Sequence, residues 1–230
     1  MALEKWEKRL AWFRRHTEEL GALFFPTVRV AHPLALQSPL CPSCGKEGVK
    51  NPRVCPNCQQ HGPWAFLWAR APYRAQGVVW EAIHRLSHRG ESFWLPRLAD
   101  WLEEGFRLFA AFFPWDALVP VPLHPVRRRE LGFNPCLELA RMLGMRQRIP
   151  VLNCLYTVRA GSSQKTLTAP ERAMDHDCAF RVKRGFDLQA QSLLIITDVL
   201  VTGLTAQGCA RALQQGGAER IAVLAVGRAE

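Results

Sequence analysis

The feature that most constrains the fold is the stretch 193–213, which reads LLIITDVLVTGLTAQGCARAL. Its four leading aliphatic residues, 193–196, are typical of a strand buried on both faces of a parallel sheet. We expect that strand to end at residues 197–198. Residues 201–205 predict a tight loop, and the composition from Ala206 onward favours a helix. The stretch therefore predicts a strand–loop–helix unit of an α/β protein.

The predicted loop carries residues suited to binding an anion. Gly203 allows positive φ or a close approach of the backbone to a ligand, and Thr202 and Thr205 supply hydroxyl groups. The following helix directs free N–H groups and the positive end of its dipole into the same space. A phosphate-binding loop is one interpretation. An ordinary strand–loop–helix unit in which Thr205 only caps the helix is the other.

Length and composition indicate a globular protein. A chain of 230 residues can bury a large core and suggests one domain with an appendage, or two small domains. No apolar run approaches the ~20 residues of a transmembrane helix, and residues 1–10 lack a secretory hydrophobic region, so we expect a cytoplasmic protein without a membrane span. The net charge of +10 favours polyanionic partners: nucleic acid, phosphorylated metabolites or anionic lipid.

Four of the eight cysteines form two close pairs, Cys41 with Cys44 and Cys55 with Cys58. A two-residue spacing lets both thiolates of a pair reach one metal ion, and a second pair completes a tetrahedron around Zn²⁺. Four thiolates leave no open position, so the pattern predicts a structural zinc site. We expect the other four cysteines to be buried, reduced thiols, because the chain has no export signal. They are Cys136, Cys154, Cys178 and Cys209.

Hydrophobic periodicity predicts an alternation of strands and helices after an N-terminal amphipathic helix. The predicted helices span residues 2–20, 73–89, 91–113 and 135–143. The predicted strands span residues 64–71, 116–123, 151–158, 177–183 and 220–227. The polar, aperiodic residues 159–170 form a candidate mobile loop. The alternation over residues 117–227 gives an open α/β sheet.

Arg127, Arg128 and Arg129 form the densest basic cluster in the chain. The cluster follows the predicted strand 116–123, so one interpretation is an anion-contacting loop at the C-terminal edge of the sheet, where α/β proteins usually bind ligands. A solvated turn is the alternative.

Four blocks of the sequence, in the same order, resemble the ComF family of competence-associated proteins, also called the GntX family. The blocks are CPSC…CPNC, VPVPLHPVRRRELGFNP, SSQKTLTAPERAMDHDCAF and IITDVLVTGLTAQ. The resemblance implies an open, mostly parallel sheet of type I phosphoribosyltransferase type, with a small zinc ribbon and an N-terminal helix. It divides the chain into a helix and linker (1–40), the zinc ribbon (41–63) and a phosphoribosyltransferase-like domain (64–230).

The segment after residue 196 is similar to the ribose-phosphate signature of type I phosphoribosyltransferases, in which an acidic pair leads into Thr-Thr-Gly-x-Thr. The similarity implies that Asp198 holds the ribose or Mg²⁺. It implies that the phosphates of phosphoribosyl pyrophosphate contact Thr202, Gly203, Leu204, Thr205, Arg127 and Arg128. It also implies that Gln164 and Arg172 belong to the mobile loop.

The sequence departs from these family patterns at several polar positions. Thr197 replaces the first acid, Val201 replaces the first loop threonine, and Ser87 stands where the family has a lysine. These changes keep phosphate binding and weaken the case for turnover.

Three functions follow from the resemblance. The first is a protein that binds a ribose phosphate and single-stranded DNA during DNA uptake, together with other DNA-uptake proteins. The second is an active Mg²⁺-dependent phosphoribosyltransferase with an unknown acceptor. The third is a scaffold that contacts only protein partners.

Overall fold

The computed structural model describes residues 33–49, 55–158 and 179–229. All of them belong to one compact unit, Pro33–Glu230, which contains both the cysteine pairs and the sheet. The predicted helix 2–20, the predicted loop 159–170 with Gln164, and the residues Arg172 and Cys178 lie outside the described residues. The domain boundaries at residues 40 and 63 stay predictions.

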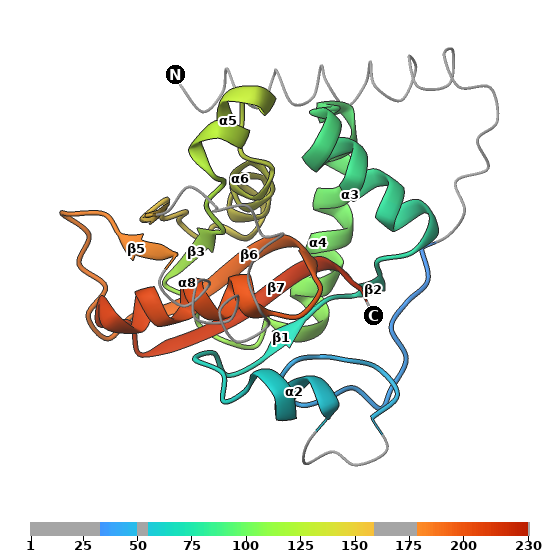
Figure 1. Ribbon diagram of the computed structural model, residues 1–230, viewed down its shortest axis with the longest axis horizontal. Coiled ribbons are helices and arrows are strands. Elements are labelled where there is room, and N and C mark those ends of the chain that lie inside the picture. The colour runs from blue at the N-terminus through green and yellow to red at the C-terminus, as the bar shows by residue number, and fades with distance from the viewer. Residues whose placement is uncertain (1–32, 50–54, 159–178, 230) are drawn as a thin grey trace, which may run out of the picture. The chain divides into compact units, whose positions relative to one another are not determined.

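The centre of the fold is a five-stranded sheet in which the paired strands are parallel (Figure 1). Its order is β1 (Ala69–Arg70), β7 (Arg220–Arg228), β6 (Ser192–Leu200) and β3 (Ala117–Pro120), and β2 (Tyr73–Arg74) also pairs with β7. This topology confirms the predicted open, mostly parallel α/β sheet.

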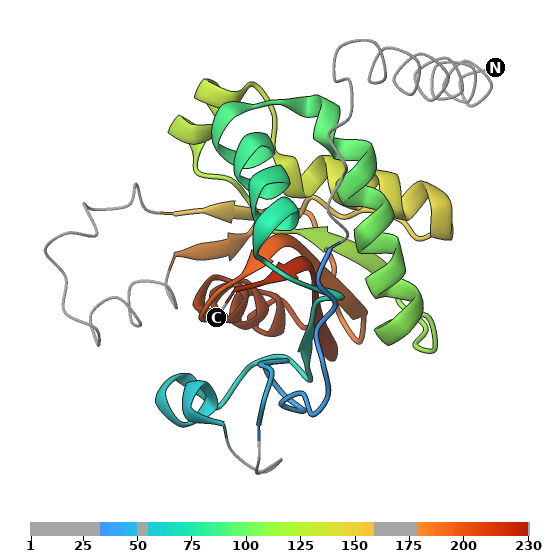
Figure 2. The same cartoon turned by 90° about the vertical axis from the view of Figure 1, so that its right-hand side faces the viewer.

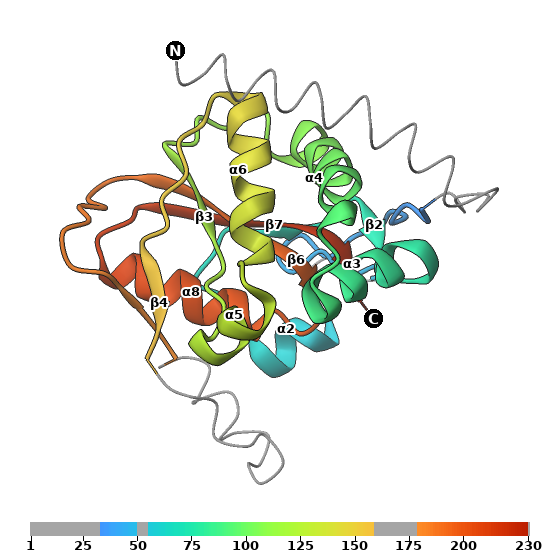
Figure 3. The ribbon, with the colours of Figure 1, turned by 90° about the horizontal axis from the view of Figure 1, so that it is seen from above.

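Helices cover both faces of the sheet, so the fold has three layers (Figure 2). One face is covered by α8 (Leu204–Gln215). The other face is covered by α3 (Gly77–Arg89), α4 (Leu95–Phe109) and α6 (Pro135–Gln147). Seen from above, α4 and α6 lie next to one another, with α6 over β3 and β6 and α4 over β7 (Figure 3).

Strand β6 lies between the two layers of helices and takes part in both cores. Leu193 and Ile195 belong to the core under α8, whereas Leu194 and Ile196 belong to the core under α3, α4 and α6. All four side chains are fully buried, as predicted for a strand covered on both faces.

Two short strands and a short helix are among the described elements that lie outside this sheet. Strands β4 (Leu155–Thr157) and β5 (Phe180–Val182) form a separate antiparallel pair, at the places of the predicted strands 151–158 and 177–183. Helix α2 (Pro56–His61) follows the third cysteine. Within the described residues, no helix is long and apolar enough to cross a membrane. Cys136, Cys154 and Cys209 are free and buried, as predicted.

Two predicted helices proved too long. The segment 73–89 begins as β2 because Tyr73 pairs with Gly227 of β7, and α3 starts only at Gly77. The segment 91–113 consists of a 3-10 turn, η1 (Ser92–Trp94), and α4, which ends at Phe109. Trp115 donates to the carbonyl of Ala110 beyond that end, so the chain turns back toward β3.

Three further predictions need correction. The strand predicted over 64–71 is reduced to β1. Strand β6 does not end at residues 197–198 but runs to Leu200, because β7 continues beside it. The predicted arginine loop is wrong: residues Pro125–Leu131 form helix α5, in which a proline at N1 follows a capping His124.

Candidate functional site

A pocket of about 310 Å³ opens where the parallel strands β3 and β6 end. Its wall comes from the residues after β3, the end of β6, the loop 201–205, the first residues of α6 and α8, and Ser87 of α3. Parallel strands bring their C-terminal ends to one edge of a sheet, where ligands of open α/β folds bind. The structure thus brings Asp198, Thr202, Gly203 and Thr205 around one cavity.

The loop 201–205, here called the anion loop, leads into α8 through an N-cap residue that has no capping side chain. Gly203 is the N-cap residue with φ of +92°, a conformation that favours glycine. The hydroxyl oxygen of Thr202 accepts a hydrogen bond of 3.3 Å from the N–H of Leu204. Among the described residues, nothing accepts from the N–H groups of Thr205 and Ala206. These donors, together with the helix dipole, suit an oxyanion of a phosphate group.

The N-terminus of α6, the second helix that starts at the pocket, is capped by a side chain. Asn134 is buried, accepts from the N–H of Cys136 at 3.1 Å and donates to the carbonyl of Val121 at 3.0 Å. The N–H of Cys136, the residue of α6 that lines the pocket beside Pro135, therefore already has an acceptor, unlike those of Thr205 and Ala206 in α8. Burial also raises the pKa of the Cys136 thiol well above its usual value, so this wall of the pocket is neutral.

Asp198 is the only ionisable carboxylate among the described residues that line the pocket. Its Oδ2 accepts from the hydroxyl of Ser87 at 2.5 Å. Its Oδ1 accepts from the backbone N–H of Val199 at 2.8 Å and from the hydroxyl of Thr197 at 3.3 Å. Thr197 and Ser87, which stand where the family patterns have an acid and a lysine, therefore both contact this carboxylate. These hydrogen bonds hold it in a fixed orientation at the edge of the cavity.

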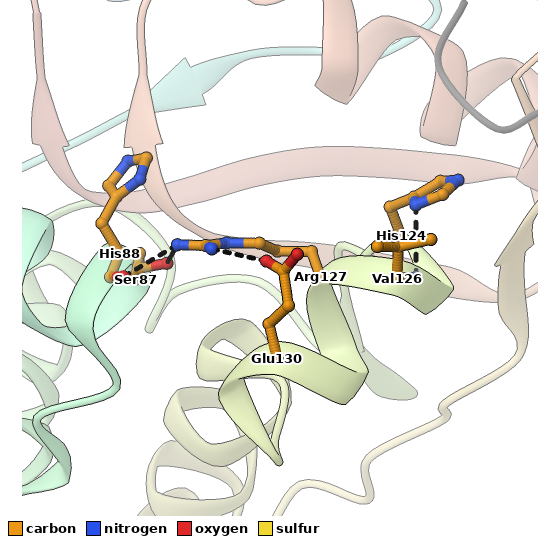
Figure 4. Close-up of polar contacts among 6 residues, drawn as sticks. All are labelled: Ser87, His88, His124, Val126, Arg127 and Glu130. Carbon is orange, nitrogen blue, oxygen red and sulfur yellow. Dashed lines mark hydrogen bonds and ion pairs between the residues drawn. The ribbon is translucent and has the colours of Figure 1, made fainter.

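Arg127, the first residue of the arginine cluster, bonds to groups of the protein itself (Figure 4). Arg127 donates to the carbonyls of Ser87 (3.3 Å) and His88 (2.9 Å) and forms an ion pair of 2.7 Å with Glu130. This guanidinium joins α5 to the C-terminal end of α3. The next two residues of α5, Arg128 and Arg129, are exposed.

The residues that line the pocket do not include these three arginines or Leu204. The predicted contacts of Leu204, Arg127 and Arg128 with phosphoribosyl pyrophosphate stay predictions. His88, whose carbonyl accepts from Arg127, keeps an exposed side chain. Partial burial of its ring and the positive charges of His84 and Arg127 lower its pKa below the usual value.

The four sulfur atoms of Cys41, Cys44, Cys55 and Cys58, here called the cysteine cluster, lie within 4.8 Å of one another. Two of the separations are 3.7 Å (Cys41 to Cys58) and 3.4 Å (Cys44 to Cys55). A tetrahedral Zn²⁺ with Zn–S bonds of about 2.3 Å requires sulfur atoms about 3.8 Å apart. The cluster thus has the donor set and the spacing to hold a metal ion such as zinc.

The electrostatic surroundings of the cysteine cluster also fit bound thiolates. Burial raises the pKa of Cys44 and Cys58. For Cys41, hydrogen bonds from the backbone of Cys44 and Ser43 outweigh burial and lower the pKa to about 7. Two guanidinium groups, from Arg70 and Arg228, lie beside the cluster. Burial lowers the pKa of both, and negative charge on the cysteines opposes that change.

Residues from two distant parts of the sequence connect the cysteine cluster with the pocket, and sequence reasoning assigned none of them this role. They are Asn57 of α2, Trp64, and Arg228 at the end of β7. One sequence feature could have drawn attention to Arg228, because it is the charged residue that directly follows the apolar run 221–227. Asn57 and Trp64 gave no such signal.

No family model matches the chain. The chain is 28% identical over 201 residues to competence protein F of Haemophilus influenzae, which covers 83% of this chain and 85% of that protein. It is 30% identical over 192 residues to the DNA utilization protein YhgH of Escherichia coli, covering 80% of this chain and 82% of that protein. Among solved structures, an allosteric regulatory enzyme of purine biosynthesis aligns with 58% of this chain, at 16% identity and a TM-score of 0.41; the aligned part is 26% of that enzyme.

Proposed function

This chain belongs to the ComF family of competence-associated proteins, and from that membership we propose that it binds a phosphorylated ribose in the pocket at the end of β6. The observation that carries the proposal is the start of α8, where the N–H groups of Thr205 and Ala206 have no acceptor among the described residues and both residues line the same cavity as Asp198. The phosphate group of the ligand binds at the anion loop. The ribose hydroxyls donate hydrogen bonds to Asp198, which is fixed by Ser87.

The pocket supports binding better than turnover. Loss of pyrophosphate from a phosphoribosyl group builds positive charge on the sugar and negative charge on the leaving group, and both need stabilisation. Mg²⁺ in such sites is usually held by one or two carboxylates together with substrate phosphates. Among the described residues that line the pocket, Asp198 is the only carboxylate and no basic side chain is present. We therefore propose a ligand-binding protein, with ribose 5-phosphate or phosphoribosyl pyrophosphate as the ligand.

Isothermal titration calorimetry of the full chain with ribose 5-phosphate tests this proposal. Asp198→Asn should weaken binding of ribose 5-phosphate about tenfold or more, because a lost charged hydrogen bond is worth about 1.5–3 kcal/mol. The same variant should bind inorganic phosphate as the parent does, since Asp198 contacts only the sugar. Asp187→Asn is the matched control, because Asp187 is exposed, lies outside the pocket and accepts from the N–H of Gln189. Absence of binding in the parent protein would end the proposal.

We further propose that the protein binds single-stranded DNA next to the pocket. The two relatives are named for competence and for DNA utilization. The net charge of +10 favours a polyanion, and the helices α3 and α5, which contact each other, carry the exposed residues Arg89, Arg128 and Arg129. Affinity for a labelled oligonucleotide, measured by fluorescence anisotropy, should then fall linearly with the logarithm of the salt concentration. Equal, negligible affinity from low to high salt would contradict this part.

We propose zinc as the ion in the cysteine cluster, because four thiolates with no open position form a structural zinc site. Metal analysis of the purified protein should give one zinc per chain. Replacement of Cys44 by serine should remove it, whereas replacement of the buried Cys209 by serine should leave the zinc content unchanged.

A further inference from the structure

The strongest unexplained feature is a buried cation between the cysteine cluster and the anion loop. Arg228 is 3% exposed. Its Nη1 donates to the carbonyl of Val201 at 2.8 Å, and its Nη2 lies 3.9 Å from the sulfur of Cys44. Its Nε has no hydrogen-bond partner within the described part of the chain. One guanidinium group therefore contacts both the loop and the cluster.

A buried guanidinium needs compensating negative charge, because an unpaired buried charge is strongly unfavourable. In the described ranges, no carboxylate forms an ion pair with Arg228, and the group beside it that can carry negative charge is the sulfur of Cys44, 3.9 Å from its Nη2. Four thiolates around one Zn²⁺ carry an excess of two negative charges. Arg228 and Arg70, the latter bonded to the carbonyls of Cys41 and Pro42, balance that excess.

The anion loop receives two more contacts from residues beside the cysteine cluster, so three successive loop residues are held from the same side. Asn57 donates to the carbonyl of Thr202 at 3.2 Å. The indole of Trp64 lies against Gly203, where an added Cβ would be 3.4 Å from the ring, and its Nε1 donates to Cys58 at 3.2 Å. Together with Arg228 on the carbonyl of Val201, these contacts support the backbone at 201, 202 and 203.

We propose that Arg228 is a positioning residue that couples metal binding in the cysteine cluster to the conformation of the anion loop. With the metal bound, the thiolate charge holds the guanidinium in place and the guanidinium holds the carbonyl of Val201. Without the metal, the sulfur atoms are no longer held together beside the guanidinium, and Arg228 no longer fixes the loop. The functional consequence, metal-dependent affinity for a phosphorylated ribose, rests on the proposed function; the coupling itself does not.

Hydrogen exchange of the zinc-saturated full chain tests the coupling without any ligand. The amide of Gln207 donates to the carbonyl of Gly203 at 2.9 Å and so reports whether the loop keeps its shape. In Arg228→Met, this amide should exchange about tenfold or more faster, as expected for loss of a charged hydrogen bond. Residues 193–197 of β6 should exchange as in the parent. Arg146→Met is the control, because Arg146 of α6 forms ion pairs with Asp100 and Glu103 of α4.

Removal of zinc with a chelator provides the second arm. It should accelerate exchange at Gln207 in the parent protein and have little further effect in Arg228→Met. Unchanged exchange in zinc-saturated Arg228→Met would overturn the coupling, as would equal acceleration of both proteins by the chelator. Should Arg228→Met not fold, Arg228→Lys serves instead: it keeps a buried positive charge but loses the planar guanidinium that reaches the carbonyl of Val201 and the sulfur of Cys44 at once, and it must also accelerate exchange at Gln207.

Calorimetry with ribose 5-phosphate separates this inference from the proposed function. If the parent binds the ligand, Arg228→Met should bind it about tenfold more weakly at saturating zinc. If the zinc-loaded parent does not bind ribose 5-phosphate, the proposed function is refuted, and the exchange measurements still decide the coupling.

Discussion

Replacement of Gly203 by alanine tests whether the shape of the anion loop matters for ligand binding. Gly203 has φ of +92°, in the region that residues with a Cβ rarely adopt. The added Cβ would lie 3.4 Å from the nearest atom of Trp64, which is an ordinary contact. The effect of the substitution therefore comes from backbone strain rather than from a clash.

The magnitude follows from the cost of a left-handed conformation for a residue with a Cβ, about 1–2 kcal/mol. If the loop keeps its shape, this strain lowers the free energy of unfolding, and the melting temperature falls by about 2–8 °C for a protein of this size. If the free loop relaxes instead, ligand binding must restore the shape. Affinity for ribose 5-phosphate then falls by roughly 5- to 30-fold, because 1.4 kcal/mol is a factor of ten.

The assay combines thermal unfolding with calorimetry, and the structure offers a matched control. Gly185 has φ of +90°, a Cβ added there would have no atom within 4 Å, and the residue lies outside the pocket. Gly185→Ala should lower the melting temperature by a similar amount and leave the affinity for ribose 5-phosphate unchanged. If Gly203→Ala changes neither stability nor affinity, the left-handed turn is not required and the reasoning about the anion loop is wrong.

Three further outcomes are expected. Because its folded-state pKa lies below the value of about 6.5 in the unfolded chain, His88 makes the free energy of unfolding fall as the pH drops through 6.5; denaturant titrations of His88→Gln at pH 7.5 and 5.5 should show a smaller fall. The double variant Arg89→Ala, Arg129→Ala should flatten the salt dependence of single-stranded DNA binding by about 0.7 for each lost phosphate contact, and Arg220→Ala, at the opposite edge of the sheet, should not. Leu194→Ala should cost about 2–5 kcal/mol in denaturant unfolding, whereas the exposed Leu108→Ala should stay within about 0.5 kcal/mol; similar values for the two would contradict the assignment of the core.

The parts of the fold that sequence predicted well depend on local signals. The apolar run 193–196, the glycine in the loop, and the pair Gly216 and Gly217 that ends α8 are readable within one short stretch. The open α/β sheet was predicted from the alternation of strand and helix stretches along the chain. Helix α5 was missed because its seven residues form barely two turns, too few for a hydrophobic period to show.

The parts of the site that sequence did not predict depend on contacts between residues far apart in the chain. Ser87 and Asp198 are separated by 111 positions, and Arg228 and Cys44 by 184. Neither residue type nor spacing indicates such a pair, because tertiary packing alone decides which polar groups meet. The same holds for Arg127, whose guanidinium joins two helices although its neighbours suggested an exposed cluster.

The order of the strands along the chain has a consequence for biosynthesis. Apart from single bridges of Tyr73 to Ala35 and of Leu118 to Val151, the described strands β1, β2 and β3 pair only with β6 and β7, which are the last two of the described strands to be made. While the ribosome is still translating the middle of the chain, these early strands have apolar side chains and no partner in the sheet. The paired sheet can therefore form only after residues 192–228 have left the exit tunnel, and until then the apolar side chains of β1, β2 and β3 lack the cover that β6 and β7 later provide.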